Sequence, residues 1–202
     1  TDEDLLYQVL GKLGRQLLRY ARGEDESPVA QIGETEPVKS VGNGLTFRRN
    51  LVGYKDVRTG VGSFADEVAG RLRRYKLYAG SVQVLIKDPD LKSISRQKAL
   101  PYATNLAKDL TDAAMELIVN NWDLNKPIRM LTGTAGQVSE FPFAVQTSFL
   151  EQTPGLDPKR EKLETSMDRI REKYGRTSIL QAGELHNTIG IDTEARPHEE
   201  EE

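Results

Sequence analysis

Two arginines, a lysine and several hydroxyl side chains lie close together in the stretch Lys39–Leu51, which reads KSVGNGLTFRRNL. Lys and Arg side chains bind phosphate oxygens, and Ser and Thr hydroxyls can donate hydrogen bonds to the same oxygens. Apolar Leu45 and Phe47 alternate with polar Thr46 and Arg48, as in a half-buried β-strand. The stretch therefore predicts a strand that presents Thr46 and Arg48 to a polyanion.

Arg49 directly follows Arg48, and the alternation alone does not fix its orientation. Successive side chains of a strand point to opposite faces, so Arg49 faces away from Arg48 unless a bulge turns it. Leu51 fits the alternation only if a bulge precedes it. The sequence leaves both orientations of Arg49 open.

Side chains suited to covalent or metal-assisted catalysis are scarce. The chain has no cysteine and only His186 and His198, which excludes a Cys/His metal cluster and a His-based triad. The glycines of VGNG and GTAG do not continue into the G-K-[ST] of a phosphate-binding loop. Asp88 and Asp90 flank a proline, which favours a turn over a Mg²⁺ site. We therefore expect no catalytic residue, metal or cofactor in this chain.

The formal net charge of −3 over 202 residues hides an uneven distribution. Residues 1–37 carry 4 Lys and Arg against 8 Asp and Glu, residues 38–133 carry 16 against 9, and residues 134–202 carry 8 against 14. A basic middle between acidic ends favours a nucleic-acid partner, and an ordinary solvated surface is the alternative. No apolar run is as long as a membrane span, and the lack of cysteine suits a reducing cytosol, so we expect a cytoplasmic protein without a membrane partner.

The ends of the chain differ in pattern from its middle. Leucines at helical spacing predict a helix over 1–22, and the Gly- and Pro-containing run at 23–40 predicts a linker. Residues 137–157 are irregular, and residues 158–176 predict an amphipathic helix whose apolar side is formed by Leu163, Met167, Ile170 and Tyr174. For the tail at 177–202, docking on the preceding domain and a disordered tether are equally open.

The middle of the chain, 41–136, predicts a β-α-β-β-α-β unit of the α+β class. The expected elements are a strand at 45–51, a helix at 61–76, strands at 80–88 and 93–102, a helix at 105–121 and a strand at 126–136. Two helices then cover one face of a four-stranded sheet and leave the other face free. The polar side chains expected on that free face are Thr46, Arg48, Ser95, Gln97 and Arg129.

Five stretches, in the same order, resemble Y-family translesion DNA polymerases of the bacterial DNA polymerase IV, or ImpB/MucB/SamB, type. VKSVGNGLTFRRNL, VQVLIKDPDLKSISRQKAL and KPIRMLTGT resemble the first strand, the central hairpin and the last strand of the little-finger domain. LGKLGRQLLRYARGEDESPV resembles the end of the thumb, and KREKLETSMDRIREKYG resembles the helical C-terminal segment. The resemblance covers about residues 5–176.

The resemblance implies that the chain is a C-terminal portion of a polymerase that acts in damage bypass and the SOS response. The parent protein is then a DNA-directed DNA polymerase, whose palm carboxylates hold two Mg²⁺ ions for nucleotidyl transfer. That palm is not recognisable in these residues, so we expect this chain to be inactive by itself and to work beside the palm, fingers and thumb of the same polypeptide.

The resemblance also assigns DNA-binding positions and a second partner. The little-finger strands of the family contact template and primer phosphates in the major groove. The corresponding residues here are Lys39, Ser40, Thr46, Arg48, Arg49, Ser95, Arg96, Lys98 and Arg129. Bacterial members carry a Q-L-[SD]-L-F peptide that binds the sliding clamp, and the matching place here is occupied by Gln146, Thr147, Ser148, Phe149 and Leu150. Local packing of Phe149 and Leu150 is the alternative.

Two other classes of function compete with this interpretation. One is a stand-alone nucleic-acid-binding module that uses the sheet as a platform. The strands lack the pairs of exposed aromatic residues that RNA-recognition sheets use for base stacking, which disfavours such a module. The other is a structural interaction domain that works through the helix at 159–174.

Overall fold

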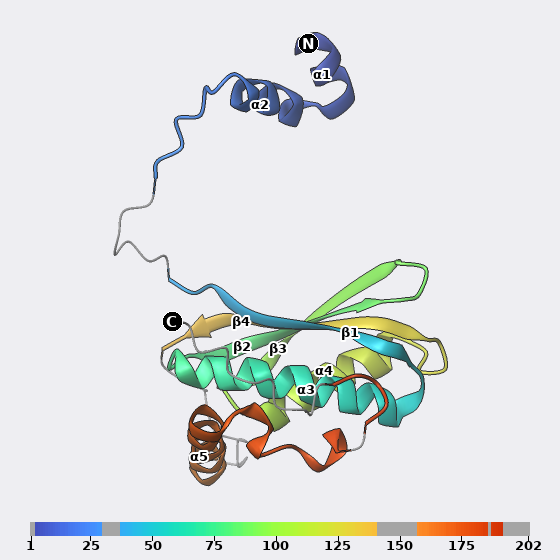
Figure 1. The fold of residues 1–202 in the computed structure, drawn as a ribbon, viewed down its shortest axis with the longest axis vertical. Coiled ribbons are helices and arrows are strands. Elements are labelled where there is room, and N and C mark those ends of the chain that lie inside the picture. The colour runs from blue at the N-terminus through green and yellow to red at the C-terminus, as the bar shows by residue number, and fades with distance from the viewer. Residues whose placement is uncertain (1–2, 30–36, 141–156, 186, 192–202) are drawn as a thin grey trace. The chain divides into compact units, whose positions relative to one another are not determined.

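The computed structural model describes residues 3–29, 37–140, 157–185 and 187–191. The chain forms two compact units, Thr1–Pro37 and Val38–Glu202 (Figure 1). The four-stranded α+β fold expected from the sequence is present in the second unit.

The first unit contains two short helices, α1 (Glu3–Leu10) and α2 (Lys12–Ala21), in place of the one helix expected over 1–22. They separate at Gly11, whose φ of 61° lies in the left-handed region that interrupts a helix. Among the described residues of this unit only Gly14 is buried. The leucines that predicted the helix therefore form an uncovered hydrophobic side, which includes Leu5, Leu10, Leu13 and Leu17.

The second unit follows the predicted β-α-β-β-α-β order. Its elements are β1 (Ser40–Leu51), α3 (Gly53–Arg74), β2 (Tyr78–Lys87), β3 (Ser93–Thr104), α4 (Ala107–Asn121) and β4 (Ile128–Ser139), followed by α5 (Pro158–Tyr174) and two 3-10 turns at Arg176–Ser178 and Ala182–Glu184. The sheet order is β1-β4-β2-β3, and every neighbouring pair is antiparallel. Strands β1 and β2 are thus parallel with β4 between them, and β3 and β4 are parallel with β2 between them. The two βαβ connections interleave, which is the split βαβ arrangement.

Two elements begin earlier than the sequence pattern indicates. Strand β1 starts at Ser40 because the glycine-rich stretch before Leu45 pairs with β4 as far as the Ser40–Gly136 pair. Helix α3 starts at Gly53, and Val57 and Val61 in its first half are fully buried. Glycines reduce the apparent strand and helix propensity of both segments, and tertiary pairing outweighs that local preference.

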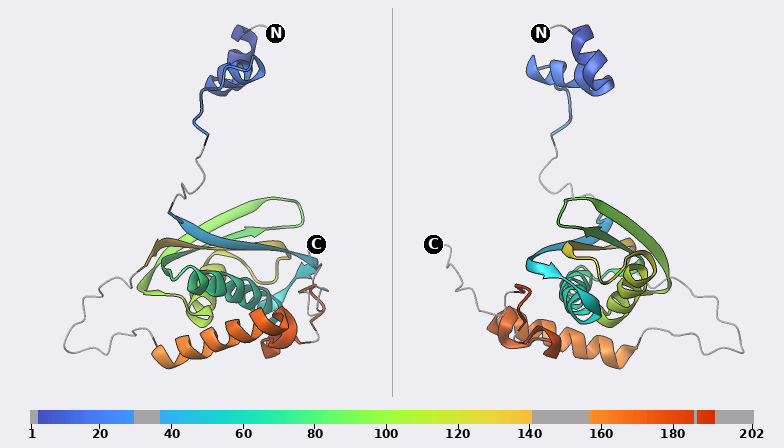
Figure 2. Two further views of the ribbon diagram at one scale, coloured as in Figure 1. Left: turned by 60° about the vertical axis from the view of Figure 1, so that its left-hand side comes forward. Right: turned by 90° about the vertical axis from the view of Figure 1, so that its right-hand side faces the viewer.

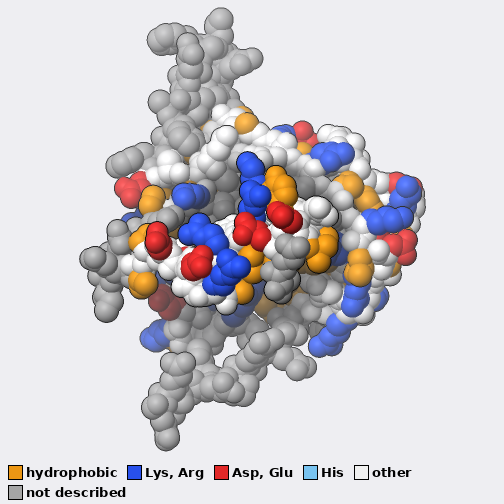
Figure 3. All heavy atoms as spheres, turned by 90° about the horizontal axis from the view of Figure 1, so that it is seen from above, with side chains coloured by type: hydrophobic (Ala, Val, Ile, Leu, Met, Phe, Trp, Pro, Cys, Tyr) orange, Lys and Arg blue, Asp and Glu red, His pale blue; other side chains and the backbone are white. Residues whose placement is uncertain are grey.

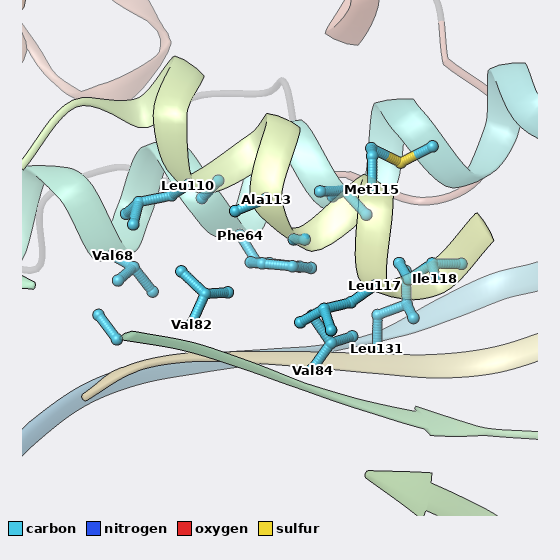
Figure 4. Packing of buried hydrophobic residues seen from close by; sticks show 14 of the residues in the cluster. Phe64, Val68, Val82, Val84, Leu110, Ala113, Met115, Leu117, Ile118 and Leu131 are labelled. Carbon is cyan, nitrogen blue, oxygen red and sulfur yellow. The ribbon is translucent and has the colours of Figure 1, made fainter. Parts of the chain in front are cut away.

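Helices α3 and α4 cover one face of the sheet, and no element that the structure describes in this unit covers the other face (Figures 1 and 2). Phe64 and Val68 from α3 and Leu110 from α4 point toward Val82 and Val84 of β2 (Figure 4). The hydrophobic core therefore lies between the helices and one face of the sheet, and the other face remains available for a partner.

The position of α3 over the sheet depends on the glycine at 133. A Cβ at Gly133 would lie 2.0 Å from a ring carbon of Phe64, so the Phe64 ring lies directly against the β4 backbone. Any residue larger than glycine at position 133 would overlap the Phe64 ring. The close contact therefore sets the distance between α3 and the sheet.

Helix α5 packs against the end of α3 and the start of α4 through charged side chains. The Arg73 side chain is 6% exposed, and its guanidinium donates to Asp168 at 2.6 Å and to Glu164 at 2.5 Å. Glu164 also accepts the backbone N–H of Ala107 at the first turn of α4. Burial raises the pKa of Glu164, which is the expected cost of placing a carboxylate there.

The expected apolar side of α5 does not mediate this packing. Leu163, Ile170 and Tyr174 are exposed, and α5 turns its acidic side toward α3 and α4. Helical spacing identified the helix correctly, but it could not identify the packed side, because the partners are polar groups on other elements, chiefly the buried Arg73.

Candidate nucleic-acid interface

The residue pairing of the sheet defines its open face. Directly opposite residues of antiparallel strands share a face, so the pairs across β1, β4, β2 and β3 form cross-sheet rows. Four such rows lie on the open face: Ser40-Gly136-Ser81-Ala99, Gly42-Thr134-Gln83-Gln97, Gly44-Thr132-Leu85-Ser95 and Thr46-Met130-Lys87-Ser93. The open face is therefore rich in hydroxyl and amide groups, and Lys87 is the one cation within its rows.

The rows between them belong to the helix-covered face. They are Val41-Ala135-Val82-Lys98, Asn43-Gly133-Val84-Arg96 and Leu45-Leu131-Ile86-Ile94. Arg96 and Lys98 accordingly reach toward α4, where Arg96 donates to Asn121 at 3.0 Å and Lys98 pairs with Glu116 at 2.6 Å. The structure thus separates these two cations from Ser95, which lies on the open face.

Strand β1 leaves its register with β4 after Thr46. The pairing resumes only at Leu51 with Ile128, so the four residues 47–50 of β1 lie opposite the single residue Arg129 of β4. This irregularity contains both arginines of the opening stretch, and Phe47 beside them is buried in the core. A bulge turns side chains out of the simple alternation, which is why parity alone did not place Arg49.

Arg49 is held by partners from three parts of the chain. Its guanidinium contacts both carboxylate oxygens of Asp56 in the first turn of α3, the hydroxyl of Thr188, and the backbone carbonyl of Asn50. These five hydrogen bonds match the five N–H donors of an arginine side chain. The bond from Arg49 lowers the pKa of Asp56 and raises that of Arg49.

Arg129 also bonds within the domain. Its half-buried side chain donates to the backbone carbonyl of Phe47 at 2.5 Å, and a longer bond of 3.5 Å reaches the carbonyl of Arg48. The side chain thereby satisfies carbonyl groups of the bulge that have no partner in β4. DNA contact by Arg129, as by Arg49, Arg96 and Lys98, stays a prediction.

The other predicted DNA-binding positions are at or near the open face. Ser40 and Thr46 lie in its rows and are exposed. Lys39 precedes β1 directly, and Arg48 follows Thr46 by two residues; both are exposed. The view from above draws residues of both units and not the open face alone; in it, Lys and Arg side chains are interspersed with acidic and hydrophobic ones (Figure 3).

The sequence reading missed several residues of the open face. Thr132, Thr134, Gln83 and Lys87 lie in the four rows, although none was a candidate. Their position depends on pairing between strands that are distant in sequence, and β4 joins the sheet between β1 and β2. Alternation within each strand showed which residues share a face, but the pairing was needed to show which strands adjoin.

The clamp-binding candidates Gln146, Phe149 and Leu150 lie outside the described residues. In the parts of the chain that are described, no three His, Asp or Glu side chains are grouped as metal ligands. No helix within the described ranges has the length and apolar character needed to cross a bilayer.

A four-stranded antiparallel sheet with interleaved βαβ connections and an open polar face defines a split βαβ domain of the α+β class. Residues 38–148 match the C-terminal domain of the impB/mucB/samB family. The chain belongs to this family, and the family resemblance indicated by the sequence is confirmed.

Relatives with the name DNA polymerase IV align with most of the chain. The protein of Acetivibrio thermocellus is 35% identical over 179 residues, which are 87% of this chain and 44% of the relative. The protein of Clostridium kluyveri is 29% identical over 189 residues, with shares of 91% and 46%. The protein of Bacillus anthracis is 31% identical over 188 residues, with shares of 90% and 43%. The chain thus spans less than half the length of these relatives.

Proposed function

We propose that the open face of the sheet binds the sugar-phosphate backbone of duplex DNA without regard to base sequence. The observation that carries this proposal is the composition of the four open-face rows. Nine of their sixteen positions are Ser, Thr or Gln, Lys87 lies in the last row, and Lys39 and Arg48 lie near the two ends of β1.

Such a face suits phosphates better than bases. Ser, Thr, Gln and cationic side chains donate to phosphate oxygens, and these contacts carry no sequence information. The alternative, a base-stacking platform, needs exposed aromatic side chains. The four open-face rows contain no aromatic residue, and Phe47 of β1 is only 2% exposed.

The family supports a more specific role. Since curated relatives have the name DNA polymerase IV, we propose that this domain grips the primer-template duplex for a DNA polymerase that bypasses damage. Nucleotidyl transfer, its Mg²⁺ ions, and a cytoplasmic site of action near the nucleoid are part of the same proposal for the whole protein. No chemical step is assigned to the described residues, which hold no grouped metal ligands.

A salt titration tests the proposal. The chain is titrated against fluorescent duplexes of unrelated sequence at several salt concentrations, and affinity is read by anisotropy. Three cations, Lys39, Arg48 and Lys87, adjoin the open face. At about 0.9 per neutralised phosphate, log K should fall against log salt concentration with a slope of about −3, equally for every sequence.

Arg48→Ala should lower the magnitude of that slope by about 0.9 and weaken binding to all duplexes alike. Lys108→Ala on α4 is the matched control, because it removes an exposed cation from the helix layer. A flat salt dependence of the wild-type chain, or equal losses from both substitutions, would contradict the proposal.

A further inference from the structure

A short segment near the C-terminus, Asn187–Ile191, lies against the bulge of β1. The backbone N–H of Arg48 donates to the carbonyl of Ile189 at 2.9 Å. The hydroxyl of Thr188 accepts two bonds from the Arg49 guanidinium, at 2.9 and 3.1 Å. Arg48 and Arg49 of β1 therefore each have a hydrogen-bond partner that lies about 140 residues away in sequence.

The segment is anchored as part of the fold. Ile189 is 2% exposed and belongs to the hydrophobic core of the sheet domain. Burial of an isoleucine side chain removes a large apolar surface from water, which stabilises the contact of this short segment. The segment thus differs from a loosely placed strand that a ligand could easily displace.

The segment also has its own internal bonds. The Asn187 side chain accepts the backbone N–H groups of Gly190 and Ile191 at 3.1 Å, and it donates to the carbonyls of Glu184 and Ile191. These four bonds close a turn whose Gly190 has a φ of 87°. A side-chain-stabilised turn of this kind gives the segment a defined shape before it contacts β1.

Gly190 limits the position of the Arg48 side chain. A Cβ at this position would lie 2.4 Å from Cγ of Arg48 and 3.0 Å from its Cβ and Cδ. The aliphatic part of Arg48 therefore lies directly over the Gly190 backbone. Thr188 orients Arg49 together with Asp56, and Gly190 together with Ile189 orients Arg48.

We propose that Asn187–Ile191 is a positioning element for the bulge of β1 and for the Arg48 side chain, with Arg49 as the internal anchor, so that DNA affinity of the open face depends on this distant segment. Thr188 and Gly190 are the positioning residues. The inference rests on the proposed function, because it concerns how well Arg48 is placed for phosphate contact when Arg49 holds the bulge to this segment. It adds that the bulge of β1 requires a third element, besides α3 and β4, to hold its arginines.

Two matched pairs of variants test the role of the segment in the full 202-residue chain. Gly190→Ala introduces a Cβ at a positive φ and into the Arg48 side chain, whereas Gly175→Ala introduces one at a φ of 89° with no atom within 4 Å. Thr188→Val removes the hydroxyl that accepts from Arg49 and keeps the side-chain shape, whereas Thr188→Ser retains the hydroxyl. Thermal unfolding of each variant is measured beside DNA affinity and the salt slope.

Gly190→Ala should bind duplex DNA about tenfold more weakly than Gly175→Ala, which corresponds to the loss of one charged hydrogen bond. Its salt slope should be smaller in magnitude by about 0.9. Thr188→Val should bind about threefold more weakly than Thr188→Ser. A variant with changed unfolding temperature but unchanged slope and affinity would have lost only a structural contact, which overturns the inference.

The outcomes separate this inference from the proposed function. If the wild-type chain binds DNA with the expected slope and both pairs of variants bind equally, the segment has no positioning role and the proposed function stands. Tighter binding by Gly190→Ala would show that the segment competes with DNA, which also overturns the inference. If Gly190→Ala fails to fold, the Thr188 pair decides. A wild-type chain that does not bind DNA overturns both proposals.

Discussion

Arg48 and Arg49 are adjacent in sequence but have different surroundings. Arg49 bonds Asp56 and Thr188, while the side chain of Arg48 lies over Gly190 and the backbone carbonyl of Arg48 accepts the longer bond from Arg129. The difference arises from the bulge, which removes both residues from regular pairing with β4. At the residue scale, the chemistry of an arginine therefore depends on which backbone and side-chain partners use its donors.

A prediction at the same scale concerns Gly133. Gly133→Ala places a methyl group 2.0 Å from a ring carbon of Phe64, so the ring or the helix must move. Overpacking of this kind costs about 1–3 kcal/mol, which should appear as a lower urea midpoint with an unchanged m-value. Phe64→Leu frees space at the ring and should reduce the cost of the alanine in a double-mutant cycle. Additive effects of the two substitutions would show that the close contact is not the cause.

At the element scale, the C-terminal segment follows α3 along its length. Asp66 of α3 pairs with Arg171 of α5 at 2.6 Å, and Gln181 and Gly183 lie near Gly62 and Thr59. Glu184 follows and is buried, at 6% exposed. The described residues then reach β1 at Thr188, so α3 adjoins the chain at several places between α5 and the bulge.

Glu184 gives this path a pH dependence. Burial raises its pKa above the usual value, and nearby Asp66 raises it further. The stability associated with a raised carboxyl pKa is present at low pH and is lost as pH rises through the folded-state pKa. Glu184→Gln, neutral at every pH, should therefore raise the unfolding temperature by about 2 °C at pH 7.

The gain from Glu184→Gln should decrease as the pH falls toward about 4, because the wild-type carboxyl is then protonated as well. Thermal unfolding of both proteins across pH 4–8 measures the difference. Glu172→Gln on the exposed side of α5 is the control and should show no such trend. A difference that grows on acidification would mean that the ionised carboxylate stabilises the fold.

Sequence patterns predicted the elements better than their contacts. Alternation and helical spacing located four strands and their two helices, because each period reflects a buried face. The same patterns did not show that Arg96 and Lys98 face α4. Alternation groups the residues of a strand by face, but it does not tell which face the helices cover until the neighbouring strands are known. They also did not show that Ile189 enters the core, because five residues of irregular chain have no period.

At the scale of the whole molecule, charge segregation has a partly internal cause. The basic segment 38–133 supplies Arg73, and the acidic segment 134–202 supplies Glu164 and Asp168, which pair with Arg73 across α3 and α5. Part of the positive charge that suggested nucleic acid is therefore neutralised within the chain. Ion pairs of this kind lower the number of cations available to DNA, and the expected salt slope is correspondingly modest.

A last prediction concerns primer extension by the whole chain. The described residues form the open face that we propose binds DNA but contain no grouped metal ligands, and the chain spans 44% of the Acetivibrio thermocellus relative. With primer-template, Mg²⁺ and all four nucleotides, we expect no primer extension by this chain.

Added to an extension reaction run by a full-length DNA polymerase IV, the chain should inhibit extension by sequestering the duplex, half-maximally near its own Kd for DNA. Arg48→Ala should shift that midpoint as much as it shifts the Kd. Inhibition that is equally strong for Arg48→Ala would mean that the chain acts on the polymerase and not on the DNA.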